Sequence, residues 1–138
     1  MYEYLEHEAD MGIRGIGKTI EEAFSEGAEG MYEVMVDTEK IESKKEKTFK
    51  VQSDSIEGLY VEFLNELLSI TGIGGLVFSK FVVKIKKNEE YDLSCKAYGE
   101  NLDQKKHNIK TEVKAATYSG LKYWTKEGKH FIQCIVDV

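Results

Sequence analysis

Carboxylates gather at both ends of the chain, in positions where they could bind a metal ion. The first group is Glu6-His7-Glu8-Ala9-Asp10, with four ionisable side chains in five residues. The second lies at the end of Phe131–Val138, an apolar, β-branched run typical of a buried strand. A strand there would hold the Asp137 carboxylate one residue from the α-carboxylate of Val138. Two such groups repel each other unless a cation lies between them, and hard cations prefer oxygen ligands. The alternative for both segments is a solvated turn and a solvated strand end.

A third group of charged residues leads into a predicted strand and includes some of its first residues. It comprises Asp103, Lys105, Lys106, His107, Glu112 and Lys114. Lys114 leads into the uncharged segment Ala115–Tyr118, so its amine could be ordered and could meet a phosphate or an acidic group of a partner. The competing interpretation is a charged loop that feeds an amphipathic strand, with Lys114 facing water.

Residues 12–19, Gly-Ile-Arg-Gly-Ile-Gly-Lys-Thr, match the P-loop expression literally. A true P-loop follows a buried hydrophobic strand. Here an acidic segment precedes the match and would repel phosphate, and Ile13 and Ile16 resemble strand residues. We therefore expect no nucleotide binding at Lys18.

The elements that must position these residues follow from periodicity and capping. Helical spacing predicts a helix from a Thr19 cap to about Met35, and a second from Asp54 or Ser55 to the glycine-rich segment 71–75. Strands are predicted at 2–5, 11–16, 48–52, 76–86, 90–98, 111–118, 120–126 and 129–138, with a polar loop at 99–109. The order is not a βαβ alternation. It predicts an α+β fold, with two helices packed on a mainly antiparallel or mixed sheet in a two-layer single domain over 1–138.

The composition of the chain argues against several classes of function. Of the 138 residues 41% are hydrophobic and 32% are charged, with a formal net charge of −6. This charge argues against wrapping of bare nucleic acid, although it leaves room for a local basic patch. Cys95 and Cys134 lack zinc-site spacing and are expected to be buried free thiols. No signal peptide or membrane-spanning run is visible, so we expect a cytoplasmic protein without membrane contact.

Three ordered blocks of sequence resemble the archease family, whose members assist RtcB-type RNA ligases. They are Tyr4–Ile13 with Thr19–Phe24, then Phe63–Leu68, then Gly99–Tyr118 with Val136–Val138. The resemblance covers nearly the whole chain.

The resemblance implies a divalent-metal site built by Asp10, Asp137 and the carboxylate of Val138. Calcium is the expected ion, with magnesium or manganese as alternatives. It also implies that Lys114 is functional, with His7, His107 and Glu112 as further partner-contact candidates. The implied function is not catalysis but activation of an RtcB-type ligase in tRNA splicing, by promotion of its guanylylation and multiple turnover. The protein would then meet RNA only through the ligase.

Two other functions remain open from the residues alone. One is a stand-alone metal-dependent phosphoesterase, with His7 or His107 as base and the ion held by Asp10 and Asp137. The other is a nucleotide-binding module that uses the P-loop-like match.

Overall fold

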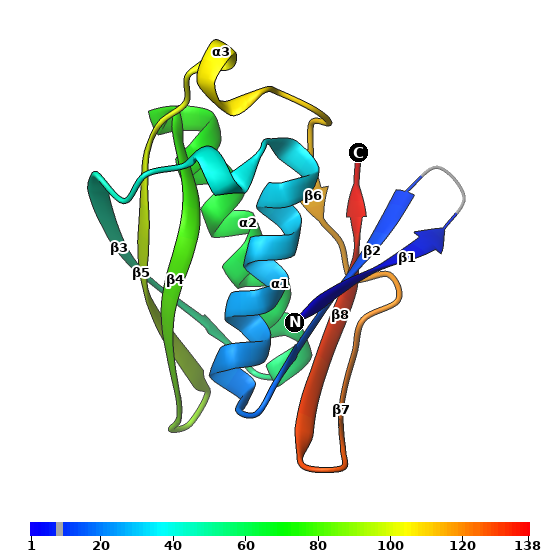
Figure 1. Ribbon diagram of the computed structural model, residues 1–138. Coiled ribbons are helices and arrows are strands. Elements are labelled where there is room, and N and C mark those ends of the chain that lie inside the picture. The colour runs from blue at the N-terminus through cyan, green and yellow to red at the C-terminus, as the bar shows by residue number, and fades with distance from the viewer. Residues whose placement is uncertain (8–9) are drawn as a thin grey trace.

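The computed structural model describes residues 1–7 and 10–138, with two main helices between two antiparallel sheets (Figure 1). The helices are α1 (Ile20–Met35), α2 (Ile56–Gly74) and the short α3 (Gln104–His107), with a 3-10 turn η1 (Thr38–Lys40). The strands are β1 (Tyr2–His7), β2 (Asp10–Gly17), β3 (Lys45–Ser53), β4 (Leu76–Lys87), β5 (Tyr91–Asn101), β6 (Ala115–Ala116), β7 (Lys122–Lys126) and β8 (Lys129–Asp137). The α+β class predicted from the sequence is confirmed.

The strands divide between two sheets, where the sequence predicted one. Within the described residues, one sheet has the order β1-β2-β8-β6, with β7 also paired to β8, and the other has the order β3-β5-β4. The reason lies in α2, where consecutive residues such as Leu59, Tyr60 and Val61 are all buried. A helix that is apolar around most of its circumference must be covered on more than one side. One sheet cannot do this, and two can.

Both predicted helix starts are confirmed. The Thr19 hydroxyl accepts from the backbone N–H of Glu22 at 3.0 Å, and the Ser55 hydroxyl accepts from Gly58 at 2.9 Å. Ser55 rather than Asp54 is therefore the cap of α2. This helix ends at Gly74 and is capped by Gly75, whose φ of 69° is the left-handed conformation that glycine adopts without strain.

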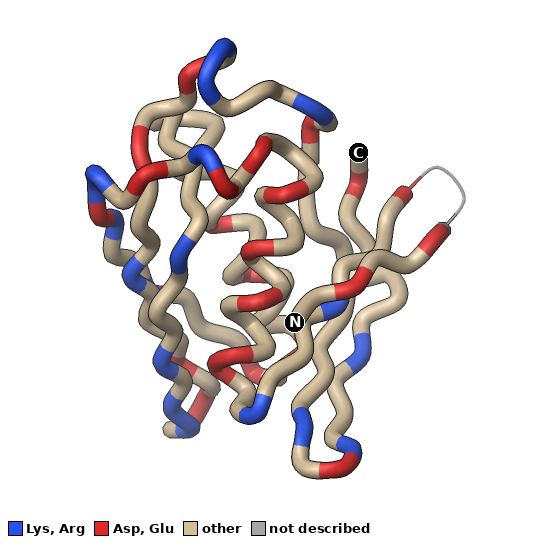
Figure 2. Tube along the Cα trace, viewed as in Figure 1, with Lys and Arg blue, Asp and Glu red and all other residues tan. Residues whose placement is uncertain are grey.

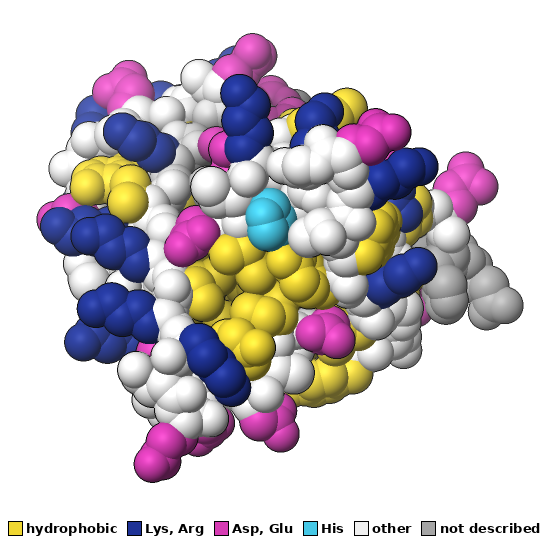
Figure 3. Space-filling view, turned by 90° about the horizontal axis from the view of Figure 1, so that it is seen from below, with side chains coloured by type: hydrophobic (Ala, Val, Ile, Leu, Met, Phe, Trp, Pro, Cys, Tyr) yellow, Lys and Arg dark blue, Asp and Glu magenta, His cyan; other side chains and the backbone are white. Residues whose placement is uncertain are grey.

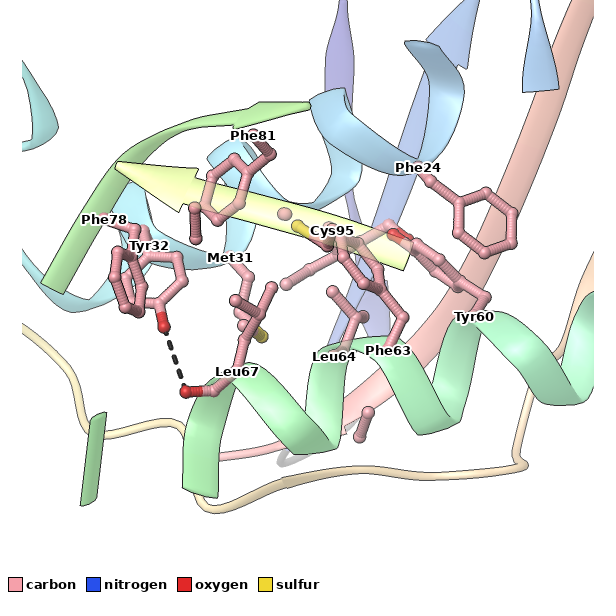
Figure 4. Close-up of a cluster of buried hydrophobic side chains, with 14 of the residues drawn as sticks. Phe24, Met31, Tyr32, Tyr60, Phe63, Leu64, Leu67, Phe78, Phe81 and Cys95 are labelled. Atoms are coloured by element: carbon pink, nitrogen blue, oxygen red, sulfur yellow. Dashed lines mark hydrogen bonds between the residues drawn. The ribbon is translucent and has the colours of Figure 1, made fainter. Parts of the chain in front are cut away.

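The core joins both helices to both sheets. Figure 4 shows aromatic rings in two groups, with Tyr32 of α1 against Phe78 and Phe81 of β4, and Phe24 of α1 against Tyr60 and Phe63 of α2. The Tyr32 hydroxyl donates to the carbonyl of Leu67 at 3.1 Å, so this buried polar group is satisfied. Cys95 and Cys134 are buried free thiols, as predicted, and burial raises the pKa of each to about 12.

The segment between β5 and β8 departs from prediction. β5 continues to Asn101, and residues 104–107 form a helical turn where a loop was expected. The strand predicted at 111–118 is reduced to Ala115–Ala116. The cause is a competing partner, because Lys110 and Thr111 donate their backbone N–H groups to the C-terminal carbonyls of α1, Met35 and Val34.

None of the described helices is long and apolar enough to cross a membrane.

Candidate functional site

The register of β2 and β8 brings the two ends of the chain together. Met11 pairs with Val136 in this antiparallel ladder. One step further along the same register sets Asp10 opposite Asp137. Directly opposed residues in antiparallel strands share a face, with Cβ atoms about 4.5–5.5 Å apart. The start of β2 and the end of β8 lie at the same end of the sheet (Figure 1). The two aspartates predicted from opposite chain ends are therefore neighbours there.

The face on which these aspartates stand is the one turned away from the helices. Ile13 and Cys134, which pair with each other, belong to the hydrophobic core, and so does Val136. Side chains alternate along a strand, so Asp10 and Asp137 lie on the opposite face from these core residues. Asp10 is half-buried and Asp137 is exposed.

Lys114 lies on the other side of β8 from Asp10. It immediately precedes β6, where Ala115 pairs with Asp137. The backbone N–H of Lys114 donates to the carbonyl of Asp137 at 2.8 Å, and its side chain is exposed. The structure therefore brings Asp10 and Asp137 together at the ends of β2 and β8, with Val138 directly after β8 and Lys114 directly before β6.

The predicted ligands are of the type that a hard cation prefers, but few side chains contribute to them. Among residues 1–7 and 10–138, no group of three or more His, Cys, Asp or Glu side chains is placed to hold a metal ion. The predicted ligand set draws on only two such side chains, Asp10 and Asp137, with the α-carboxylate of Val138 as the third group. That set contains only oxygen donors, as calcium and magnesium prefer.

His107, predicted as a partner contact, is instead wholly buried. Its Nδ1 accepts from the backbone N–H of Asp103 at 2.9 Å, so Nε2 carries the proton and donates to Glu100 at 3.0 Å. Both ring nitrogens are engaged within the protein. His107 is therefore not placed to act as the base of the hydrolase alternative or to contact a partner.

Glu100 is the centre of this buried polar network, which the sequence analysis missed. Its carboxylate accepts from the backbone N–H of Glu42 at 2.8 Å and pairs with the ammonium of Lys106 at 2.8 Å. The hydrogen bond from Glu42, then those from Lys106 and His107, lower the pKa of Glu100 to about 2. The network anchors the start of the segment that leads to Lys114.

The other two predicted contact residues are Glu112 and His7. Glu112 is exposed in the irregular stretch between α3 and β6. His7 ends β1, and its backbone pairs with that of Asp10. The side chain of His7, with Glu8 and Ala9, lies outside the described residues.

The P-loop-like match forms no phosphate loop. Gly12 to Gly17 lie within β2, which is paired on both sides by β1 and β8. Gly15 serves close packing, because a Cβ there would lie 1.9 Å from the carbonyl oxygen of Ala23 on α1. Thr19 is occupied as a helix cap. This motif therefore gives no structural support to the alternative of a nucleotide-binding module.

Comparisons with known proteins agree with this architecture. The archease protein family (MTH1598/TM1083) matches residues 2–138. The archease proteins of Pyrococcus abyssi and Pyrococcus furiosus are each 45% identical to this chain over 139 residues, which cover 99% of this chain and 98% of the relative.

Two solved structures are also similar. The solution structure of Methanobacterium thermoautotrophicum protein 1598 has a TM-score of 0.86 and 31% identity, and the match covers 99% of this chain and 98% of that one. A Thermotoga maritima crystal structure, described as an archease and possible chaperone, has a TM-score of 0.59 and 21% identity over 100% of this chain and 98% of that one. This last likeness concerns the fold alone. By its family match and its close relatives, the chain belongs to the archease protein family.

Proposed function

We propose that this protein activates an RtcB-type RNA ligase by promoting guanylylation of the ligase, through a divalent-metal site at the paired ends of β2 and β8. The observation that carries the proposal is the register of β2 and β8, because one step beyond the Met11–Val136 pair sets Asp10 opposite Asp137, whose carbonyl accepts from Lys114. The choice of partner is the one that the resemblance to the archease family implies.

Electrostatics supports a cation at this point. Two carboxylates at a separation of about 5 Å would repel each other by at most roughly 3 kcal/mol at an effective dielectric constant of about 20, and by less where solvent screens the exposed Asp137. A calcium ion held by Asp10, Asp137 and the carboxylate of Val138 would relieve this repulsion. A bound divalent ion supplies positive charge that can stabilise phosphate oxygens.

The role of the chain's own residues is to position charge. The ladder between β2 and β8 fixes the two aspartates, and the hydrogen bond from Lys114 to Asp137 fixes the backbone of the lysine beside them. The exposed ammonium of Lys114 can then approach nucleotide phosphates in the ligase pocket. A net charge of −6 suits a basic, RNA-binding partner and predicts association that weakens with salt.

The decisive experiment measures guanylylation of a cognate ligase with labelled GTP, with and without this protein. We expect Asp10→Asn and Asp137→Asn to reduce the stimulation by about tenfold or more, the size of effect typical of a weakened metal site. Asp54→Asn is the matched control, because Asp54 is exposed and lies outside the site. Full stimulation by both site variants would show that the aspartates play no part.

A second measurement isolates the metal site from the ligase. Calcium titration by calorimetry should give weaker binding when two residues are appended after Val138, because the α-carboxylate is displaced. Unchanged calcium affinity would remove Val138 from the ligand set.

A further inference from the structure

The outer face of the three-stranded sheet is open to solvent and basic. The sheet packs its other face on the helices through residues such as Phe49, Val83 and Cys95. Strand pairing arranges the outward side chains of β3, β5 and β4 in four rows. The rows are Glu46-Tyr98-Lys80, Thr48-Lys96-Val82, Lys50-Ser94-Lys84 and Gln52-Asp92-Lys86.

This face has a charge opposite to that of the whole chain. Its four rows hold five lysines and two acidic residues, whereas the formal net charge of the protein is −6. Figure 2 shows the basic positions following these strands, and Figure 3 shows lysine and arginine side chains gathered on the same side of the molecule. The charge is therefore segregated in space, which the sequence composition does not reveal.

The two acidic residues of the face are already engaged. Glu46 lies 3.9 Å from the ammonium of Lys96. Asp92 accepts hydrogen bonds from Gln52 at 2.6 Å and from Asn88 at 2.5 Å.

Within the described residues, the lysines near Asp92 form no ion pair, although Asp92 lies beside Lys86 in its row. In the described part of the chain, Lys50, Lys84 and Lys86 form no ion pair within 4.0 Å. The three lysines line one hollow of about 540 Å³ together with Ser94 and the Asp92 carboxylate, whose oxygens already accept from Gln52 and Asn88. Unpaired ammonium groups around a shared hollow form a site for an anion.

A neighbouring hollow continues the same surface. It measures about 280 Å³ and is lined by Lys84, Lys96, Val82 and Tyr98. Lys80 lies over the Tyr98 ring at 5.4 Å. From Lys80 to Lys86 the face extends about 20 Å, at about 3.4 Å per residue, so it can meet several charges of one extended polyanion.

We propose that this lysine face binds the phosphodiester backbone of single-stranded nucleic acid. Lysine contacts to phosphate are independent of base sequence. The Tyr98 ring is half-buried with Lys80 over it, so the lysines carry the contact. An acidic protein partner fits less well, because protein interfaces have an apolar core depleted in lysine, and Val82 is the exposed apolar residue of the rows. Lysines on the edge strands β3 and β4 can be explained as protection against pairing with the strand of another chain. This explanation does not apply to Lys96, which lies on the central strand β5. The proposal goes beyond the proposed function, since it adds direct RNA contact to contact through the ligase.

Fluorescence polarisation with labelled oligouridine and oligodeoxythymidine of about 20 nucleotides tests the face. The variant carries Lys50→Gln, Lys84→Gln and Lys86→Gln. The control carries Lys122→Gln, Lys126→Gln and Lys129→Gln on the exposed β7–β8 hairpin, which changes the net charge equally. At about 0.1 M salt we expect the first triple variant to bind at least tenfold more weakly than the wild type. The slope of log affinity against log salt should fall by about 2, at about 0.7 per phosphate contact.

The control triple should bind both oligonucleotides with nearly wild-type affinity. If both triple variants lose the same affinity for the oligonucleotides, the loss comes from net charge alone and the proposal is overturned. Absence of salt-dependent binding by the wild type would overturn it as well. A poly-glutamate peptide that binds as tightly as oligouridine, with the same lysine dependence, would assign the face to an acidic polypeptide instead. Urea unfolding verifies that both triple variants are folded.

Discussion

Replacement of Glu100 by glutamine should destabilise the protein in a pH-dependent manner. The pKa of Glu100 falls from 4.5 to about 2 because its carboxylate accepts from Glu42, Lys106 and His107. At 1.36 kcal/mol per pH unit, this corresponds to at most about 3 kcal/mol of stability. Lys106 is partly exposed, so solvent screening reduces the expected loss in Glu100→Gln to about 2 kcal/mol.

The sign of the pH dependence follows from the lowered pKa. The ionised carboxylate contributes fully above about pH 4.5, and the contribution is lost as the pH falls toward 2. Glutamine does not titrate. The difference in unfolding free energy between wild type and Glu100→Gln should therefore shrink on acidification, with less than half remaining at about pH 3.

Urea unfolding of both proteins at about pH 7 and about pH 3 measures this difference. Glu46→Gln is the matched control, because Glu46 is exposed and its contact with Lys96 is 3.9 Å long. We expect less than about 0.5 kcal/mol for the control at either pH. A difference for Glu100→Gln that is equal at both pH values would refute the assignment of its effect to the carboxylate charge.

Two further predictions concern glycine packing and a second carboxylate. Gly15→Ala should lower the free energy of unfolding by about 3 kcal/mol or more, measured in thermal or urea unfolding, because its Cβ would lie 1.9 Å from a backbone oxygen. Gly72→Ala should instead raise it by about 0.5–1 kcal/mol, because Gly72 lies in α2 with open space around it. A Gly15→Ala protein as stable as the wild type would contradict the close approach of β2 and α1. Burial and then the neighbouring Glu26 raise the pKa of Glu29 to about 7. The protonated side chain therefore contributes to the stability of the fold below about pH 4.5, and this stability is lost as the pH rises through 7. Glu29→Gln should therefore remove this loss and be more stable than the wild type at about pH 8, and equal pH profiles would contradict the burial.

Local signals in the sequence predicted the helices well. Thr19 and Ser55 provide cap side chains for the starts of α1 and α2, and Gly75 provides a left-handed stop for α2, so three of the four ends are specified by residues next to them. The division into two sheets was not predicted, because it depends on which strands find each other across the chain. The apolar stripe of α2 was visible, but the extent to which it wraps around the helix becomes clear only when both sheets are in place.

The Glu100–His107 network could not be predicted for a related reason. Its residues resemble a solvated charged loop, and one of the donors to Glu100 is the backbone of Glu42, which is 58 residues away in sequence. Nothing in the pattern around Glu42 signals that partner. A signal did exist in Asp103, whose side chain caps α3 and accepts from Lys105 and Lys106. A capping aspartate four residues before a histidine indicates a short helical turn there.

The geometry of the candidate metal site is imposed by the hydrophobic core. Ile13 pairs with Cys134 and Met11 with Val136, so alternation turns these residues to the helices and Asp10 and Asp137 to the other face. A slip of one residue between β2 and β8 would leave the two carboxylates out of register. It would also turn one strand's buried side chains outward, at a cost of about 1.5–3 kcal/mol for each large apolar residue exposed. The repulsion between the aspartates, at most roughly 3 kcal/mol, is too small to force that slip, because several core residues would have to move together. The core can therefore hold two like charges side by side, which is the condition that a cation site requires.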